Sequence, residues 1–213
     1  MKRTLAFAAS LLLLGACSSD GYTIRGKIAG LDNPYVYLLR YTGEVEVIDS
    51  AKVTKGDFVF KGKAEQPEVV YLSTDKQQPF VHFFLENGRI SVDGALSAPA
   101  DIAVLGTPSN DIQRAFDEKI AALEEEFAKA GNDVQRDSLR KEYSKLMSDA
   151  VEMNRDNIYG VTTFLNNAYA FLSPEEVMEQ IALFPAEWQQ RTELTDLRKV
   201  MEQRLRTTVG QPY

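Results

Sequence analysis

The hydrophobic and polar residues of the chain follow two different patterns, which change near residue 107. From residue 22 to about 106, apolar residues alternate with polar ones, and Gly, Pro and Asn interrupt the alternation every few residues. A period of two is typical of half-buried β-strands joined by turns. The pattern therefore predicts an antiparallel β-sandwich or a partly open barrel. The expected strands are 23–28, 35–41, 45–53, 57–63, 69–74, 80–86 and 89–93.

One turn in this region is a strong hairpin signal. In Glu86-Asn87-Gly88-Arg89, the Asn-Gly pair readily takes the positive φ angles of a type I′ turn. The sequence therefore predicts a hairpin between the strands 80–86 and 89–93.

From Thr107 onward, apolar residues recur at spacings of three and four, which is typical of helices with one buried face. Thr107 and Pro108 form a start signal, and Ser173-Pro174-Glu175-Glu176 contains an N-cap, a first-turn proline and the Glu of a capping box. The chain is thus predicted to have an α+β fold: an N-terminal antiparallel β-sandwich of seven or eight strands, followed by a helical region of about five helices that begins with a helical hairpin. The expected helices cover about 108–130, 132–150, 157–171, 173–185 and 187–206.

A separate apolar segment stands at the N-terminus. Lys2 and Arg3 are followed by an almost purely apolar run, 5–14, and by the small residues Gly15 and Ala16. This layout is typical of a secretion signal, so residues 1–16 are expected to be removed. The apolar run is shorter than the roughly 20 residues that a transmembrane helix needs.

Leu14-Gly15-Ala16-Cys17 resembles the lipobox of bacterial lipoproteins, and Cys17 is the only cysteine of the chain. The resemblance implies that the Cys17 sulfur receives a diacylglyceryl group and that its nitrogen is acylated after cleavage, typically with palmitate. Residues 17–21 would then form a lipidated tether. We expect a lipid-anchored protein of the bacterial cell envelope, and the Ser that follows Cys17 favours the outer membrane by the same resemblance.

The charge of the chain excludes two classes of binding partner. Without residues 1–16, the chain has 22 basic and 31 acidic side chains, which is a formal charge of −9. Nucleic acids and anionic lipid surfaces are bound through clustered Lys and Arg, so neither is an expected partner. With Cys17 lipidated, no free thiol remains for redox chemistry.

The titratable residues form no recognisable catalytic pattern. His82 is the only histidine, and alternation places it on one strand face with Phe80 and Phe84. One histidine without a cysteine makes a poor metal site, and no Ser or Cys nucleophile is visibly paired with it. The carboxylates of 124–126 and 175–176 are best explained as solvated helix faces and caps. We therefore expect a structural His82, no catalytic residue, no metal and no cofactor.

Tyr35, Tyr37 and Tyr41 share one face of a predicted strand, and Val36 and Leu38 lie on the other. An exposed aromatic strip can stack on sugar rings, but either face could also belong to the core. Core or sheet packing is the favoured interpretation, and a glycan-binding face is the alternative. A hydrolase with dispersed carboxylates is a third hypothesis, since sequence spacing cannot show whether two carboxylates flank a cleft.

Four short segments carry a family resemblance: Tyr22–Ile28, Lys55–Gly62, Phe84–Ile90 and Leu105–Asn110. In this order they resemble the domain-of-unknown-function 4369 family, a β-sandwich found near the N-terminus of Gram-negative envelope lipoproteins, with its exit into helices.

The segment Val209-Gly210-Gln211-Pro212-Tyr213 is similar to the opening of a thioredoxin-like domain of the alkyl hydroperoxide reductase and thiol-specific antioxidant type, which follows in many such proteins. The chain has no CxxC motif, so the disulfide chemistry of that domain is carried over to no residue here. The expected division is a signal (1–16), a tether (17–21), a β-sandwich domain (22–106), a helical region (107–208) and the start of a missing thioredoxin-like domain (209–213).

Together these observations predict a membrane-anchored, non-catalytic interaction or positioning module of the envelope. The resemblance implies that its partner is a thioredoxin-like thiol-disulfide system, as a domain or as another envelope protein. The alternative is a glycan-binding envelope lipoprotein that uses the aromatic strand face.

Overall fold

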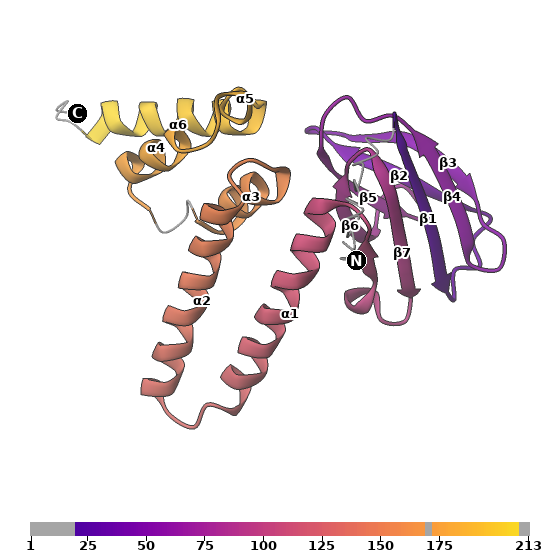
Figure 1. The fold of residues 1–213 in the computed structure, drawn as a ribbon, viewed down its shortest axis with the longest axis horizontal. Coiled ribbons are helices and arrows are strands. Elements are labelled where there is room, and N and C mark those ends of the chain that lie inside the picture. The colour runs from indigo at the N-terminus through magenta and orange to yellow at the C-terminus, as the bar shows by residue number, and fades with distance from the viewer. Residues whose placement is uncertain (1–19, 169–171, 209–213) are drawn as a thin grey trace, which may run out of the picture.

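A computed structural model describes residues 20–168 and 172–208 of the chain (Figure 1). In this part, eight strands in two sheets are followed by six α-helices, which confirms the predicted α+β fold. The strands are β1 (Tyr22–Ala29), β2 (Tyr35–Tyr41), β3 (Val45–Lys52), β4 (Asp57–Gly62), β5 (Glu68–Ser73), β6 (Pro79–Leu85), β7 (Gly88–Ala95) and β8 (Ala103–Leu105). The helices are α1 (Pro108–Lys129), α2 (Asp133–Met153), α3 (Ile158–Thr163), α4 (Pro174–Ala182), α5 (Ala186–Gln189) and α6 (Thr192–Thr208).

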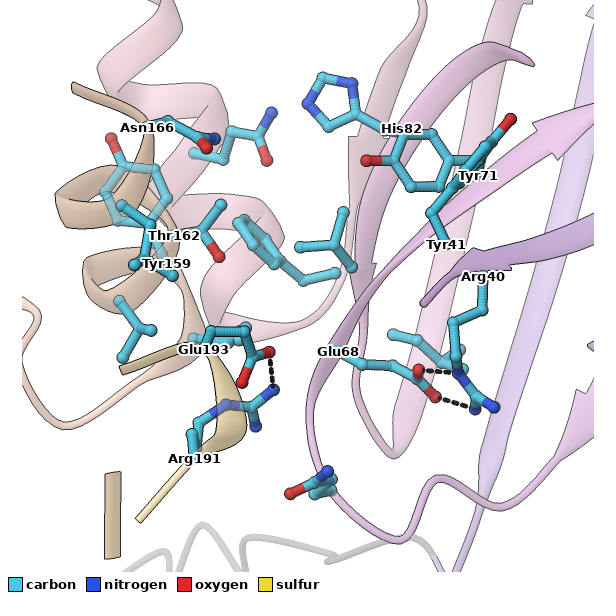
Figure 2. A pocket seen from close by; sticks show the side chains of 18 of the residues that line it. Arg40, Tyr41, Glu68, Tyr71, His82, Tyr159, Thr162, Asn166, Arg191 and Glu193 are labelled. Carbon is cyan, nitrogen blue, oxygen red and sulfur yellow. Dashed lines mark hydrogen bonds and ion pairs between the residues drawn. The ribbon is translucent and has the colours of Figure 1, made fainter. Parts of the chain in front are cut away.

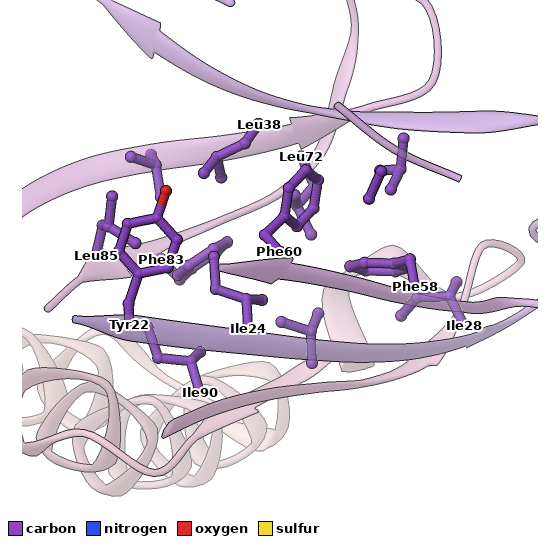
Figure 3. Packing of buried hydrophobic residues seen from close by; sticks show 14 of the residues in the cluster. Tyr22, Ile24, Ile28, Leu38, Phe58, Phe60, Leu72, Phe83, Leu85 and Ile90 are labelled. Atoms are coloured by element: carbon purple, nitrogen blue, oxygen red, sulfur yellow. The ribbon is translucent and has the colours of Figure 1, made fainter. Parts of the chain in front are cut away.

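The two sheets pack face to face, in the strand orders β4-β1-β7-β8 and β3-β2-β5-β6. Alternate residues of each strand point between the sheets, because successive side chains of a strand face opposite sides. Figure 3 shows this core, in which residues such as Ile24, Leu38, Phe60 and Leu72 are almost completely buried. The period-two pattern therefore identified the inner faces correctly.

One strand pair departs from the expected antiparallel arrangement. β1 and β7 run parallel, with Tyr22 opposite Gly88 and Ala29 opposite Ala95. Parallel neighbours cannot be joined by a tight turn, and here the chain between them forms β4 and the whole of the second sheet.

The predicted hairpin at Asn87-Gly88 is wrong. β6 and β7 lie in different sheets, and Gly88 has a φ of +151°, which is not a type I′ value. The Asn87 side chain instead accepts a hydrogen bond from the N–H of Ala64 (2.9 Å) and donates one to its carbonyl oxygen (2.8 Å). The type I′ conformation occurs at Lys55-Gly56, with φ angles of +54° and +83°, where β3 leads into β4.

The predicted helical hairpin is present as α1 and α2 (Figure 1). Asn132 caps α2, since its side chain accepts from the N–H of Gln135 at 2.9 Å. Only the part of the hairpin near the sandwich is packed: Phe116 and Met147 are buried, whereas Val134 near the tip is 80% exposed. The helical period thus predicted the helices but not the burial of the whole stripe.

The remaining helices differ from the expected ones in two places. The third helix is α-helical only over α3 and continues as a π-helix, Phe164–Ala168; residues 169–171 of the expected helix lie outside the described residues. The expected last helix is divided into α5 and α6, because residues 190 and 191 between them are not helical. The Arg191 carbonyl oxygen accepts from the N–H of Thr195 in the first turn of α6. The capping box predicted at Ser173 is confirmed at the start of α4.

A small shared core joins the sandwich to the helices. Phe84 of β6 packs with Phe116, Ala150, Ile158 and Tyr159, which come from α1, α2 and α3. The helices therefore stand against the outer face of the second sheet at its β6 side. Among the described residues, none of the helices has both the length and the apolar character needed to cross a membrane.

Candidate functional site

A large open cleft lies where the second sheet faces the helices (Figure 2). Its volume is about 1110 Å³. β2, β5 and β6 form one wall, and α1, α3, the π-helix and the start of α6 form the other. The cleft is slightly larger than the roughly 300–1000 Å³ range of small-molecule sites, so it has room for an extended ligand.

The sheet wall carries a row of three rings, Tyr41, Tyr71 and His82. Tyr71 and His82 are directly opposite each other on β5 and β6, with ring centroids 6.1 Å apart. The Tyr41 ring meets the Tyr71 ring edge to face, with a centroid distance of 4.7 Å and an interplanar angle of 78°. The row crosses three neighbouring strands, and Tyr41 and His82 are both exposed.

An ion-paired arginine lies at the end of the sheet wall. Both Nε and Nη2 of Arg40 donate to the carboxylate of Glu68, and Nη1 donates to Glu46 at 3.1 Å. The hydrogen bond to Glu68 raises the pKa of the Arg40 guanidinium further above its already high value. The Arg40 charge is therefore permanent and is neutralised within the wall itself.

Tyr159 forms the base of the helical wall. Its ring stacks on Phe116 (5.5 Å between centroids) and meets Phe84 edge to face (6.1 Å). Burial raises the pKa of Tyr159 to about 12, so its phenol stays protonated and neutral at physiological pH.

Thr162 and Asn166 come from α3 and the π-helix and also line the cleft (Figure 2). A π-helix inserts an extra residue into a helical turn and is often found at functional sites. Here it lies in the segment that brings Asn166, an exposed amide, to the helical wall.

Gln113 and Asp117 of α1 close the cleft beside His82. Both also line a smaller adjoining cavity of about 370 Å³ between β6 and α1. Partial burial raises the pKa of the Asp117 carboxyl, and the hydrogen bond from Gln113 and the nearby His82 oppose that shift. Much of the Asp117 surface is still open to solvent, so its electrostatic interactions are screened.

A buried amide holds the first helix against the sandwich. The Asn110 side chain accepts from the N–H of Phe84 (2.9 Å) and donates to its carbonyl oxygen (2.8 Å), so it pairs with β6 as another strand would. It also donates to the Thr107 hydroxyl at 2.7 Å. We call this group of bonds the Asn110 clamp.

A second connection joins α6 to the sandwich. Nη1 of Arg191 donates to the carbonyl oxygen of Pro67 (2.8 Å), and Nη2 donates to Glu193 (3.0 Å). The Arg191 guanidinium also lies over the Trp188 ring, 5.5 Å from its centroid, and only 8% of the Arg191 side chain is exposed. The helices are therefore connected to the sandwich by two separate groups of polar contacts.

The charge of the lining is slightly acidic. The lining contains three basic residues, Arg40, Lys63 and Arg191, and five acidic ones. The acidic residues of the lining are Glu65, Glu68, Asp117, Glu193 and Asp196. In the described part of the chain, no group of three or more His, Cys, Asp or Glu side chains is arranged to hold a metal ion.

The residues singled out from the sequence are distributed unevenly around this cleft. Tyr41 and His82 line it, whereas Tyr35 and Tyr37 do not, although they share a strand with Tyr41. The Tyr37 ring is covered by the Lys76 ammonium, 4.6 Å from its centroid. Cys17 and the segment 209–213 lie outside the described residues.

Sequence reasoning did not find Tyr71, Tyr159 or Arg191. The strand alternation contained one available signal, because it places Tyr71 on the same face as Val69, opposite to Val70 and Leu72. Nothing local marks Tyr159 or Arg191, since their roles depend on contacts with Phe84 and Pro67 far away in the sequence.

Comparison with known proteins finds a family model that matches the sandwich. No curated protein and no solved structure matches the chain. Residues 22–113 match the family model described as "Domain of unknown function (DUF4369)", so the match covers the eight strands and the first residues of α1. The family model thus matches the sandwich part of the chain, and the description of the family states no function.

Proposed function

We propose that this protein is a lipid-anchored envelope protein whose folded part is a non-catalytic interaction module, with the cleft as its contact site. The observation that carries the proposal is the cleft itself, which is large, open and lined by exposed aromatic and hydrogen-bonding side chains. A cavity with convergent polar groups is the usual place for a binding site.

The connections between the two walls support this proposal. The Asn110 clamp and the Arg191 contact with Pro67 hold the helices in one position against the sheet. A site whose walls are already in place loses less conformational entropy when a partner binds. The rigidity is therefore useful for binding and requires no chemistry from the lining residues.

Photocrosslinking in the source cell tests the contact site. A benzophenone amino acid replaces Asn166, which is exposed on the helical wall, and in a second strain it replaces Val59, which is 50% exposed on β4. We expect a light-dependent adduct with a protein or a glycan from position 166 and a much weaker one from position 59. Equal labelling at both positions, or none at 166, would contradict the proposal.

The anchor is proposed from the signal 1–16 and from Cys17. Two or three acyl chains on one cysteine hold a protein to a bilayer far more firmly than one chain does. Metabolic labelling with radioactive palmitate should mark the wild type and leave Cys17→Ala unlabelled. Retention of the label in Cys17→Ala would show that another residue carries the lipid.

The more specific part of the proposal names the partner, which is a thioredoxin-like thiol-disulfide system. It is supported by the resemblance of Val209-Gly210-Gln211-Pro212-Tyr213 to the opening of such a domain. The end of α6 lies on the far side of the helical region from the sandwich (Figure 1), so a partner near that end would leave the cleft accessible.

Immunoblots of source-cell membranes test this association. We expect either a band larger by roughly 100–150 residues, a typical domain, or a crosslinked partner that contains a CxxC motif. A band at the size of the processed chain, with no CxxC protein crosslinked to it, would rule out the thioredoxin-like partner. It would not contradict the proposed interaction module.

A further inference from the structure

The chemistry of the cleft restricts what can occupy it. Its sheet wall presents the row Tyr41, Tyr71 and His82 across three neighbouring strands. Neighbouring strands are about 4.8 Å apart, so the row extends on the order of 10 Å. The row is an amphipathic surface, since each ring combines an apolar face with a polar edge.

The opposite wall supplies groups that both donate and accept hydrogen bonds. Gln113 and Asn166 carry side-chain amides, and Thr162 carries a hydroxyl. An amide offers two N–H donors and a carbonyl acceptor, and a hydroxyl does both with one atom. These groups match a ligand whose own polar atoms are hydroxyls, because a hydroxyl also donates and accepts.

Charge argues against an anionic ligand. Five acidic residues outnumber three basic ones in the lining, and both arginines are already bonded to carboxylates. A phosphate or carboxylate ligand would have to displace Glu68 from Arg40 or Glu193 from Arg191, or rely on the single exposed ammonium of Lys63. A neutral ligand avoids this cost.

The edge of β6 argues against an extended peptide. A peptide that adds a strand needs the free N–H and C=O groups of an edge strand. At Phe84 both groups are bonded to Asn110, so a peptide strand could not pair along the whole of this edge.

We infer that the cleft binds a neutral oligosaccharide, which packs across the row of Tyr41, Tyr71 and His82 and turns its hydroxyls toward Gln113, Thr162 and Asn166. The inference rests on the proposed function, because it names the ligand of the same contact site. It moves the glycan-binding hypothesis from the single strand face of Tyr35, Tyr37 and Tyr41 to a ring row that keeps Tyr41 and spans three strands.

Calorimetric titration of the lipidated, detergent-solubilised full chain tests the inference. The probes are malto-, cello-, manno- and xylohexaose, with an oligogalacturonate of the same length as the acidic comparison. We expect at least one neutral hexasaccharide to bind. Tyr71→Ala should weaken that binding about tenfold, because the central ring of the row is lost.

Two further variants separate stacking from folding. Tyr71→Phe keeps the ring and should bind within about threefold of the wild type. Tyr35→Ala is the matched control, since Tyr35 is 47% exposed on the same strand face as Tyr41 but lies outside the cleft, and it should leave the affinity unchanged. Equal losses in Tyr71→Ala and Tyr35→Ala, preference for the acidic oligosaccharide, or no binding of any neutral probe would each overturn the inference.

The crosslinking experiment distinguishes this failure from failure of the proposed function. A protein adduct at position 166 without neutral-glycan binding would leave the interaction module in place with a protein as its ligand. The absence of both would remove the cleft as a contact site altogether.

Discussion

The sandwich and the α1–α2 hairpin carry similar apolar stripes but bury them to different extents. Seventeen residues form one buried cluster in the sandwich. In the hairpin, every residue between Phe116 and Met147 is at least partly exposed. A strand stripe is covered because a second sheet lies opposite, whereas the far half of the hairpin has only its partner helix. Periodicity therefore predicts an element, and the neighbouring elements decide how much its burial contributes to stability.

The largest effect should come from truncating a ring of the sandwich core. Phe60 is 1% exposed between the sheets, and Phe60→Ala should lower the free energy of unfolding by about 3–5 kcal/mol. In the hairpin, Phe127 is 37% exposed, and Phe127→Ala should cost less than about 1 kcal/mol. Urea denaturation of both variants measures the difference, and comparable losses would show that the far half of the hairpin is more tightly packed than its exposure indicates.

The same titration shows whether the two regions unfold together. Trp188 is the only tryptophan of the chain, and it packs against a core within the helices, which includes Val161 and Phe164, and against the shared core at Phe84. If the polar connections couple the regions, Phe60→Ala should shift the Trp188 fluorescence transition to lower urea, although the mutation lies in the sandwich. An unshifted Trp188 transition would mean that the helices unfold independently.

The Asn110 clamp should have the second largest effect. Asn110→Ala leaves the N–H and carbonyl of Phe84 without their side-chain partner, and each buried unpaired polar group costs about 1–3 kcal/mol. We expect a loss of about 2–4 kcal/mol in urea denaturation. Asn132→Ala is the matched control, since Asn132 is an exposed N-cap whose removal should cost only about 1 kcal/mol.

The clamp also shows the limit of prediction from sequence. Strand and helix periods, the capping box at Ser173 and the inner faces of the strands could be predicted because each depends on residues close together in the chain. The parallel pairing of β1 and β7 and the failed hairpin at Asn87-Gly88 could not, since both depend on which sheet a strand joins. Asn87 forms bonds with a distant loop at Ala64, and this side-chain contact replaces the local turn preference.

The candidate site was predictable only in part for the same reason. Tyr41 and His82 could be singled out by residue type on a strand face. The cleft exists because α1 and α3 pack beside β6, and that arrangement brings Tyr159 to Phe84 and Arg191 to Pro67. No local pattern encodes these distances.

A smaller effect is expected at the start of α4. The Ser173 hydroxyl accepts from the N–H of Glu176, and the Glu176 carboxylate accepts from the N–H of Ser173. Ser173→Ala should lower the free energy of unfolding by about 1 kcal/mol, measured by the Trp188 transition. Ser144→Ala, at an exposed interior position of α2, should be neutral or slightly stabilising because Ala favours helices. Equal losses in both variants would show that the cap contributes nothing specific.

The smallest expected effect concerns Asp117 of α1, which faces the sheet at the boundary between the sandwich and the helices. Burial raises the pKa of Asp117 in the folded protein, so the folded state holds this proton more tightly than the unfolded state. Its favourable contribution is complete in acid and is lost as the pH rises through that raised pKa. At neutral pH the ionised carboxylate therefore destabilises the fold, and Asp117→Asn should raise the free energy of unfolding by less than about 1 kcal/mol.

The gain from Asp117→Asn should vanish near about pH 3, where the carboxyl is protonated in both states. Asp137→Asn is the control of opposite sign, because it removes the exposed ion pair with Arg140 and should cost about 0.3–0.5 kcal/mol at neutral pH. A loss of stability in Asp117→Asn at neutral pH would mean that the hydrogen bond from Gln113 and the attraction of Asp117 to Arg114 outweigh its burial. Raising the salt concentration should then reduce that loss, because salt screens the attraction to Arg114 but leaves the Asn110 clamp unchanged.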